Sequence, residues 1–518
     1  MINIKREKLF KHFWILANII YLVQFIILAY FNLNNSYIWI DESNQYWISR
    51  GQIFSSEQGT RDGTIGQVYE LNKNLNLDPG GYTFYLRIFT DLFPDSIIFL
   101  RSSAFIFYLF FYMVSIVLIK QTFTDYVDRL IVIVLLSFSI FSPDMRWYSV
   151  EIRAYSMSAF SALLLMFLTL KIIKNPLRNS TLSLWIIAFT LAISTRYTNY
   201  PYAIISLITL FYCLHRKNKR LLPILVIPIS EMALMYLYMT KFQNGAGALR
   251  YTESLMFLIF DFPTLVRAFS NNFWGYPGIL RTLLLVSLLA MIFLKPKRFL
   301  GTRELILPII YLNLITLCQI IFSTLGLLPW QTHTRWALED YSYTILATVV
   351  LASTLNFFKP NQQNYLITTK IIVLLSLCML VLFNGSYFTT NLKKTSNFNV
   401  YSSVLEPKLE KEKNVQIGFL PYSDIRYLAE RNKPLPTSLL KWKDTKITLL
   451  DLSTIISLEK DLKKSMQFDK TGLVLISSLW DLDYKSKVLE VLNGLPNAEI
   501  QEINEFNTIG WILVTWSK

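Results

Sequence analysis

Two adjacent carboxylates, Asp41 and Glu42, stand in the polar stretch that directly follows the first apolar stretch of the chain. Carboxylates at a membrane edge are suited to proton transfer or to holding a polar ligand. The pair therefore predicts chemistry at a membrane surface. The alternative is an ordinary solvated loop after an anchor helix.

A second group of charged and aromatic residues lies in the stretch FSPDMRWYSVEIRAYSM. It contains Asp144, Arg146, Tyr148, Glu151, Arg153 and Tyr155. Charges so close to the hydrocarbon edge are costly unless they are paired or used by a ligand. On a helix beginning here, Glu151 shares a face with both Tyr148 and Tyr155, because residues three or four apart are neighbours. A salt-bridged helix cap is the alternative to a ligand site.

Both groups of charged residues can act at a membrane surface only if neighbouring helices anchor them there. Long apolar stretches of the sequence predict such helices. A helix of roughly 17–25 mostly apolar residues crosses a bilayer, and about eleven such spans are predicted. They run near 12–32, 97–119, 129–147, 154–173, 181–196, 200–214, 221–240, 277–294, 304–327, 337–357 and 368–386. The stretch TRYTNYP leaves room only for a tight turn between the fifth and sixth spans. After the first span no cleavage site follows, which predicts an uncleaved anchor.

The basic residues near the span ends predict the orientation. Lys and Arg are concentrated in NIKREKLFKH, KIIKNPLR, LHRKNKRLL and LKPKRFLGTRE. All of these fall on one side if the N-terminus is cytoplasmic, since cytoplasmic loops carry the excess of positive charge. An odd number of spans then places the C-terminal segment outside.

The predicted outer loops carry arginine rather than lysine. The set comprises Arg50, Arg61, Arg87, Arg101, Arg146, Arg153, Arg196, Arg250, Arg267 and Arg335. A guanidinium group matches phosphate oxygens bidentately, whereas lysine is a flexible point charge. The preference for arginine over lysine in these loops indicates anion recognition. The alternative is that these arginines snorkel to the membrane interface and pair with Asp or Glu.

Composition excludes several classes of protein. The chain has 518 residues, of which 53% are hydrophobic and 16% charged, which is too apolar for an ordinary soluble enzyme. The net charge of +15 comes without a basic stripe interleaved with aromatics, so no nucleic-acid partner is expected. Three cysteines inside apolar stretches suggest neither a disulfide framework nor a metal cluster.

Two further outer segments complete the predicted architecture. Pro79, Gly80 and Gly81 precede an aromatic-rich amphipathic helix too short to span, which is expected along the outer membrane surface. After about residue 387, the stretches NVQIGFLP, KITLLDLS, TGLVLISSLW and IGWILVTW predict strands. Helical stretches such as SDIRYLAERN and DYKSKVLEVLNG lie between them. The fold class is thus an all-α polytopic membrane domain, 1–386 with an outer first loop 33–96, followed by a small extracytoplasmic α/β domain, 387–518.

Together these motifs resemble the C superfamily (GT-C) of membrane glycosyltransferases. The acidic pair, the Pro-marked surface helix, the YS-x-E-x-R-x-Y signature and the pair Arg335 and Trp336 carry the resemblance, over about residues 10–360. It is closest to the polyprenyl-phosphate-sugar branch, which includes protein O-mannosyltransferases and the bacterial lipid A aminoarabinose transferase.

Two features of the sequence depart from that branch. Asp78-Pro79-Gly80 stands where many members have His-Pro-Pro or Lys-Pro-Pro, and Thr198-Asn199-Tyr200 stands where relatives often have Thr-His-Tyr.

The resemblance implies a role for each residue. Asp41 resembles the general base, Glu42 is expected to orient the sugar or the acceptor, and Glu151 and Asp144 are expected to hold arginines or sugar hydroxyls. The donor phosphate is assigned to Arg153, Arg146, Arg335, Tyr148 and Tyr155. His333, with Trp330 nearby, fits donor contact, but an interfacial aromatic belt is the favoured interpretation, and Glu339 and Asp340 are candidate partners of Arg335.

The predicted function is inverting transfer of a sugar from an undecaprenyl-type phosphate to a hydroxyl of a glycan, lipid or protein, outside a bacterial inner membrane. Lipopolysaccharide is one such cell-envelope acceptor. Its partners are the lipid-linked donor, the acceptor and membrane lipids, and no cofactor or metal is expected. The C-terminal domain is assigned to acceptor contact or stability.

A flippase, exporter or polymerase of lipid-linked glycans is the alternative function. Transporters usually carry their functional charges near the bilayer midplane, on broken helices in two related halves. Here the charges lie at the outer edge and no internal repeat is visible, which favours the transferase.

Overall fold

The computed structural model describes the following parts of the chain: 2–33, 40–51, 63–76, 78–93, 96–175, 177–243, 275–294, 303–324, 338–357, 415–419, 472–477, 489–495, 498–506 and 509–516. By its internal contacts the chain divides into two units. The first comprises Met1–Asn34, Asn72–Pro94 and Ile98–Tyr387, and the second comprises Asn35–Leu71, Asp95–Ile97 and Phe388–Lys518. The predicted domain boundary at 386 lies outside the described residues and stays a prediction.

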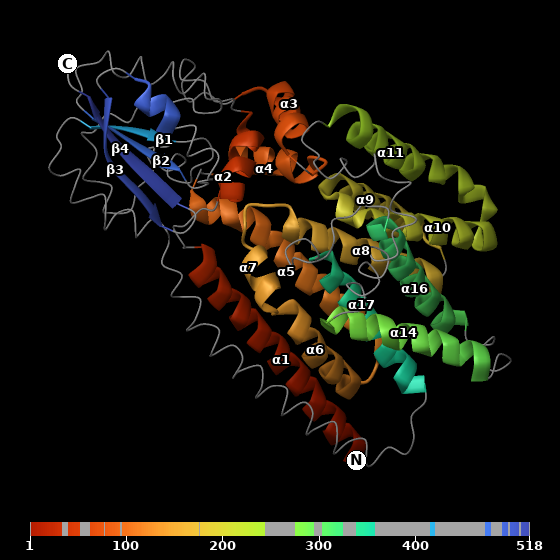
Figure 1. The fold of residues 1–518 in the computed structure, drawn as a ribbon. Coiled ribbons are helices and arrows are strands. Elements are labelled where there is room, and N and C mark those ends of the chain that lie inside the picture. The colour runs from red at the N-terminus through yellow and green to blue at the C-terminus, as the bar shows by residue number, and fades with distance from the viewer. Residues whose placement is uncertain are drawn as a thin grey trace. The chain divides into compact units, whose positions relative to one another are not determined.

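The first unit is helical, and ten of its helices coincide with predicted spans (Figure 1). They are α1 (Ile2–Leu33), α5 (Ile97–Thr122), α6 (Tyr126–Ile140), α8 (Tyr155–Lys174), α9 (Asn179–Thr195), α10 (Tyr200–Lys217), α11 (Val226–Leu237), α14 (Gly275–Leu294), α16 (Arg303–Thr324) and α17 (Glu339–Phe357). Short 3-10 and π segments, Lys219–Leu225 and Tyr238–Phe242, extend α11 at its two ends. The eleventh predicted span, 368–386, lies outside the described residues.

Several of these helices are long and apolar enough to cross a membrane. By length and composition the stretches are Lys8–Tyr30, Ile98–Thr122, Tyr155–Lys174 and Lys219–Phe242, with shorter apolar helices at Asn179–Thr195, Gly278–Leu289 and Ile306–Phe322. The protein is therefore a multi-pass membrane protein.

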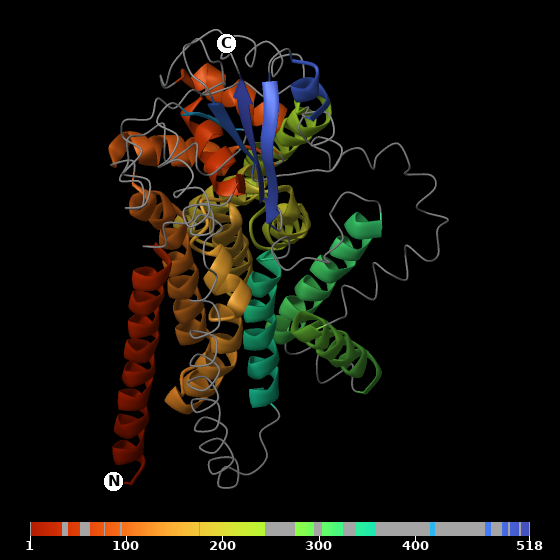
Figure 2. The ribbon, with the colours of Figure 1, turned by 60° about the vertical axis from the view of Figure 1, so that its left-hand side comes forward.

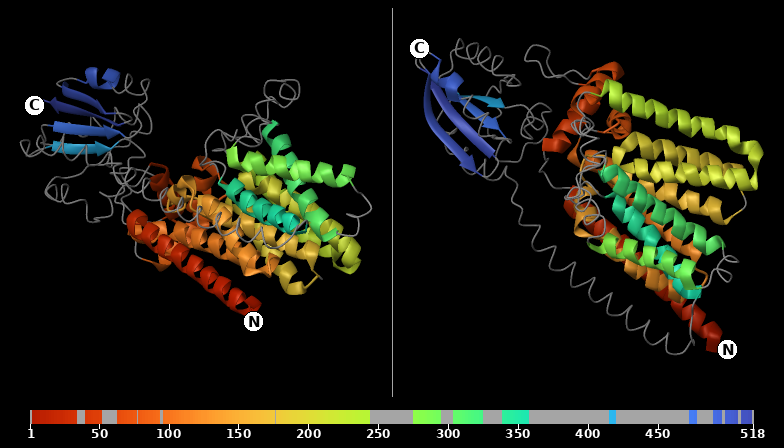
Figure 3. Two further views of the ribbon diagram at one scale, coloured as in Figure 1. Left: turned by 90° about the horizontal axis from the view of Figure 1, so that it is seen from below. Right: turned by 45° about the vertical axis from the view of Figure 1, so that its right-hand side comes forward.

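Helix α8 is the centre of the helical unit, because it packs against α9, α10, α16 and α17. Small residues allow this close approach. Ser156 Oγ donates to Ala104 O of α5 at 2.7 Å, and Ser342 Oγ of α17 donates to Ala159 O of α8 at 2.7 Å. Helices α9, α10 and α11 lie side by side (Figure 3), and α14 and α16 cross one another (Figure 2). Most of α11 is exposed, and its outward residues, such as Ile227 and Leu234, are apolar, as expected of a lipid-facing surface.

The tight turn predicted between the fifth and sixth spans is confirmed. Helix α9 ends at Thr195, Arg196 is extended, Tyr197–Asn199 form one 3-10 turn, and α10 begins at Tyr200. Asn199 Nδ2 donates to Ala192 O at 3.0 Å, which closes the turn onto α9. The turn therefore holds the side chain of Arg196 at the shared end of two helices.

The amphipathic helix predicted after Pro79 is also present, as α4 (Gly81–Leu92). Gly80 precedes it with a φ of 113°, a left-handed conformation that favours glycine. Gly81 lies directly against α9, where an added Cβ would stand 2.6 Å from the backbone oxygen of Ser194. The start of α4 and the end of α9 are thus in backbone contact.

Gly81→Ala is expected to destabilise the protein, because its methyl group meets a backbone atom that cannot rotate away. Overpacking of this kind costs about 1–3 kcal/mol in the free energy of unfolding. Thermal unfolding in detergent measures the change. Gly66→Ala in α3 (Ile65–Leu75) is the matched control, since its Cβ would meet only Thr64 Oγ1, at 3.7 Å, and alanine favours the helix. Equal melting temperatures for the two variants would contradict the contact.

The second unit contains a four-stranded sheet in the order β1-β2-β4-β3. Strands β1 (Val415–Phe419) and β2 (Gly472–Ser477) are parallel, while β4 (Ile509–Trp516) pairs antiparallel with β2 and with β3 (Ala498–Phe506). Three predicted strands are confirmed, residues 489–493 form the helix expected in DYKSKVLEVLNG, and KITLLDLS and SDIRYLAERN lie outside the described residues. The sheet and this helix agree with the predicted α/β class.

Strand β3 was not predicted, and a β-bulge explains why. Ile500 pairs with Val514 and Glu502 pairs with Leu513, so Gln501 is the extra residue. The bulge pairs Ile500 and Ile503, three residues apart, with Val514 and Ile512, which are only two residues apart along β4. That spacing is typical of a helix rather than of a strand.

Candidate functional site

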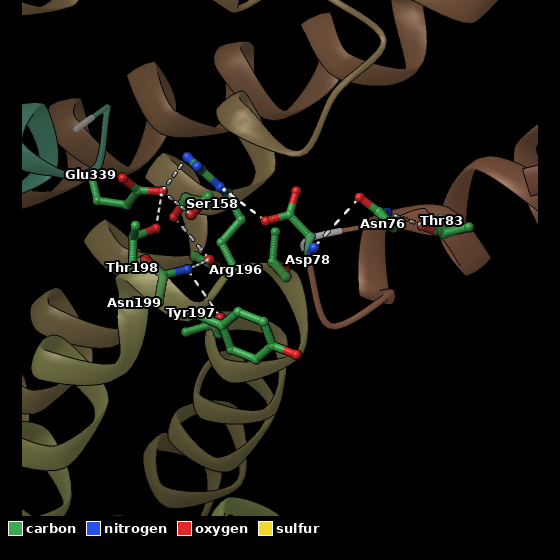
Figure 4. Close-up of polar contacts among 12 residues, drawn as sticks. Asn76, Asp78, Thr83, Ser158, Arg196, Tyr197, Thr198, Asn199 and Glu339 are labelled. Carbon is green, nitrogen blue, oxygen red and sulfur yellow. Dashed lines mark hydrogen bonds and ion pairs between the residues drawn. The ribbon is translucent and has the colours of Figure 1, made fainter. Parts of the chain in front are cut away.

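A buried cluster of charged residues lies where α8, α17 and the turn between α9 and α10 meet (Figure 4). Glu339, the first residue of α17, is 2% exposed. Its Oε1 accepts hydrogen bonds from Arg196 Nη1 at 3.1 Å, from Thr198 Oγ1 at 2.8 Å and from Ser158 Oγ. A carboxylate at this position is also stabilised by the positive end of the helix dipole. One oxygen atom thus ties three segments of the chain together.

Arg196 joins this cluster to the segment before α4. Its Nε donates to Asp78 Oδ1 at 3.3 Å, so the guanidinium group stands between two carboxylates. Burial alone would lower the pKa of Arg196, but the carboxylates of Glu339 and Asp78 raise that pKa above its ordinary value. Arg196 therefore stays positively charged although it is buried.

Amide side chains fix the segment that carries Asp78. Gln243 Nε2 donates to the backbone oxygens of Asn76 at 2.8 Å and Asp78 at 3.1 Å. Asn72 Nδ2 also donates to Asp78 O, at 3.2 Å, and Thr83 Oγ1 donates to Asn72 Oδ1 at 2.7 Å. The position of the Asp78 carboxylate is therefore set by a hydrogen-bonded frame rather than by a free loop.

A second buried ion pair lies one residue further along α17. Asp340 Oδ1 accepts from Arg281 Nη2 of α14 at 3.0 Å, from Gln319 Nε2 of α16 at 3.0 Å and from Tyr202 OH of α10 at 2.9 Å. The Arg281 guanidinium also lies 5.1 Å from the ring centre of Tyr343. Glu339 and Asp340, which the sequence suggested as partners of Arg335, thus bind Arg196 and Arg281.

The signature residues Arg153 and Tyr155 lie beside the Arg196 cluster. The Cζ atoms of Arg153 and Arg196 are 5.9 Å and 4.9 Å from the centre of the Tyr155 ring. Tyr148 packs edge-on against the same ring, with 5.5 Å between centroids. Three of the residues assigned to the donor phosphate therefore meet at one place, together with an arginine from the α9–α10 turn.

The signature is not part of one continuous helix, which corrects the expectation for Tyr148, Glu151 and Tyr155. Ser142 caps a short helix, α7 (Pro143–Tyr148), and Pro143 cannot continue the ladder of α6. The chain leaves helical conformation after α7, and α8 begins at Tyr155. Within this bend Arg153 N donates to Glu151 O at 2.6 Å.

Two other residues with predicted roles at the donor site lie in or next to this bend. Arg146 of α7 and Glu151 are both buried. Glu151 acts electrostatically on Tyr155, as do Arg153 and Arg196. The positive and negative groups of the signature therefore share one environment at the end of α8.

The remaining assigned residues lie elsewhere or beyond the described parts. Asp41 and Glu42 are the second and third residues of α2 (Ile40–Arg50), which belongs to the second unit, and Glu42 is buried. Asp144 is the second residue of α7. Arg335, with its neighbour His333, lies outside the described residues. The meeting of Asp41 and Arg335 with the signature stays a prediction.

Sequence reasoning did not single out Ser158, Arg281 or Gln319, and it noted Arg196 only as one outer arginine. A signal was available for Arg281, because a charged residue inside an apolar stretch marks a functional or paired site. The sequence contains no comparable signal for Ser158, since serine is common in membrane helices.

Comparisons with known proteins find similarity among solved structures. No protein-family model and no curated protein matches the sequence. Among solved structures, the chain is similar to the crystal structure of ArnT from Cupriavidus metallidurans in the apo state, with a TM-score of 0.38 and 11% sequence identity, over 96% of this chain and 98% of that chain.

Proposed function

We propose that this protein is an inverting glycosyltransferase that moves a sugar from a polyprenyl phosphate, such as undecaprenyl phosphate, to an acceptor hydroxyl. The observation that carries the proposal is the position of Arg153 and Arg196 around the Tyr155 ring, at the end of an apolar helix. Two guanidinium groups and a phenol hydroxyl suit a phosphate whose lipid chain stays in the membrane.

The proposed transfer reaction needs two kinds of residue: a base that takes the acceptor proton, and residues that bind the donor phosphate. The acceptor oxygen attacks the anomeric carbon from the side opposite the phosphate, a new carbon–oxygen bond forms, and the bond to the phosphate oxygen breaks. Asp41 takes the acceptor proton, and the polyprenyl phosphate leaves with the bonding electron pair. Arg153, Arg146 and Arg335 stabilise the charge that develops on the phosphate, and Tyr148 and Tyr155 donate hydrogen bonds to it.

The acidic residues position the reactants in this proposal. Glu42 orients the sugar or the acceptor, and Glu151 and Asp144 hold arginines or sugar hydroxyls. Because the charges belong to span ends that the positive-inside rule places outside, the reaction occurs on the outer face of the bacterial inner membrane, with the N-terminus cytoplasmic. The acceptor is a glycan, a lipid or a protein, and the C-terminal domain contacts it or stabilises the enzyme.

A donor panel tests the proposal. Purified protein in lipid nanodiscs is supplied with radiolabelled undecaprenyl-phosphate sugars and an envelope extract as the source of acceptor. Consumption of one donor, with release of undecaprenyl phosphate, is the expected result. If no donor is consumed while the protein moves lipid-linked glycans across liposomes, the transporter alternative is correct.

Transfer is expected to need no divalent metal, because the leaving group is a single phosphate that fixed arginines can neutralise. The measurement is the transfer rate after treatment with EDTA, which should equal the untreated rate. Loss of transfer with EDTA and recovery with magnesium or manganese would instead make Asp41, Glu42, Asp144 or Glu151 metal ligands.

A further inference from the structure

The two carboxylate oxygens of Glu339 have different surroundings. Oε1 accepts all three hydrogen bonds, from Ser158, Arg196 and Thr198 (Figure 4). Oε2 is buried and has no hydrogen-bond partner among the residues that the structure describes. A buried acceptor without a donor is costly, so native structures rarely retain one without a reason.

Helix packing does not require this second oxygen. Of the two oxygens, Oε1 makes the hydrogen bonds that join Glu339 to α8 and to the α9–α10 turn. The neighbouring Asp340 performs the same structural task with Oδ1 alone, which also accepts three bonds from three helices. Glu339 combines such a network with a buried oxygen that has no partner among the residues described here.

The surroundings of Oε2 favour a neutral donor. Arg196 is already paired with Glu339, so a second cation at Oε2 would stand close to the guanidinium group and be repelled by it. A hydroxyl group supplies the missing hydrogen bond without added charge. The same Arg196 lies 4.9 Å from the ring of Tyr155, so the unpartnered oxygen belongs to the cluster proposed to bind the donor phosphate.

We infer that Oε2 of Glu339 accepts a hydrogen bond from a hydroxyl group of the transferred sugar, and that Glu339 is a specificity-determining residue of the donor site. The inference rests on the proposed function. Oε1 holds the carboxylate in place, while Oε2 recognises the ligand.

Glu339→Gln is the variant that separates the two oxygens. A guanidinium group has donors and no acceptor, so the amide oxygen must face Arg196 and the amide NH2 takes the place of Oε2. The packing contacts remain, but a charged acceptor becomes a neutral donor. Since charge-assisted bonds are roughly twice as strong as neutral ones, affinity for the sugar-bearing donor should fall about tenfold.

The experiment compares two probes on each variant. One is undecaprenyl phosphate alone, and the other is the undecaprenyl-phosphate sugar that the wild type consumes in the donor panel. Glu339→Gln should bind undecaprenyl phosphate as the wild type does and lose affinity only for the sugar-bearing donor. Asp340→Asn is the matched control: it removes a buried charge from the same helix, so it should lower thermal stability without changing the ratio of the two affinities.

Monodeoxy analogues of the sugar identify the hydroxyl. For one analogue, the wild type and Glu339→Gln should bind with equal affinity, because the group that Oε2 recognises has been removed. The inference is overturned if Glu339→Gln weakens both probes equally, or if no analogue removes the difference. If the wild type transfers a sugar and either result is obtained, only this inference fails. If the wild type binds neither probe, the proposed function fails with it.

Discussion

Asp41→Asn is expected to lower the rate of sugar transfer by about 10²–10⁴, the usual contribution of a general base. The amide keeps the shape of the side chain and some of its hydrogen bonds, but it cannot take the acceptor's proton. Asp41 is the second residue of α2, so the substitution does not remove an apolar core residue. Donor binding and thermal stability should therefore stay close to the wild-type values while single-turnover transfer is lost.

Two further substitutions serve as comparisons for Asp41→Asn. Arg153→Lys keeps the positive charge but loses the planar fork, so it should weaken donor binding as well as turnover. Glu42→Gln should have a milder effect than either. If Asp41→Asn transfers sugar at a rate near that of the wild type, Asp41 is not the base and the role proposed for the acidic pair of α2 is wrong.

The helices of the first unit could be predicted because hydropathy is a local property. A stretch of apolar residues must form a helix in a membrane whatever its neighbours are, since its backbone has no other hydrogen-bond partner. The break between α6 and α7 was missed although its cause is also local. Pro143 after Ser142 is a helix start, and it lies inside a stretch that hydropathy alone marks as one span.

The buried ion pairs could not be predicted, because each joins segments far apart in the sequence. Arg196 and Glu339 are 143 residues apart, and Arg281 and Asp340 are 59 apart. An arginine and a glutamate at two span ends have many possible partners, and only the packing of the helices selects one. The sequence predicted that Arg196 and Glu339 lie at the same side of the membrane, which reduced the number of possible partners but did not select one.

Arg281→Met is expected to cost about 3–5 kcal/mol in the free energy of unfolding, because it leaves a buried carboxylate without its cation. Arg281 is 2% exposed, and it donates to Asp340 at 3.0 Å and to Gln319 at 2.8 Å. Methionine fills similar space but supplies no charge, so Asp340 keeps, among the described residues, the hydrogen bonds from Tyr202 and Gln319. Thermal unfolding in detergent measures the loss.

The double variant Arg281→Met with Asp340→Asn shows whether the charge pair is the cause. An asparagine oxygen can still accept from Tyr202 and Gln319, and neither position 281 nor position 340 then carries a charge, so much of the lost stability should return. A purely steric effect of methionine would persist in the double variant. Equal melting temperatures of the single and double variants would therefore show that the packing around Arg281, rather than its charge, holds α14 to α17.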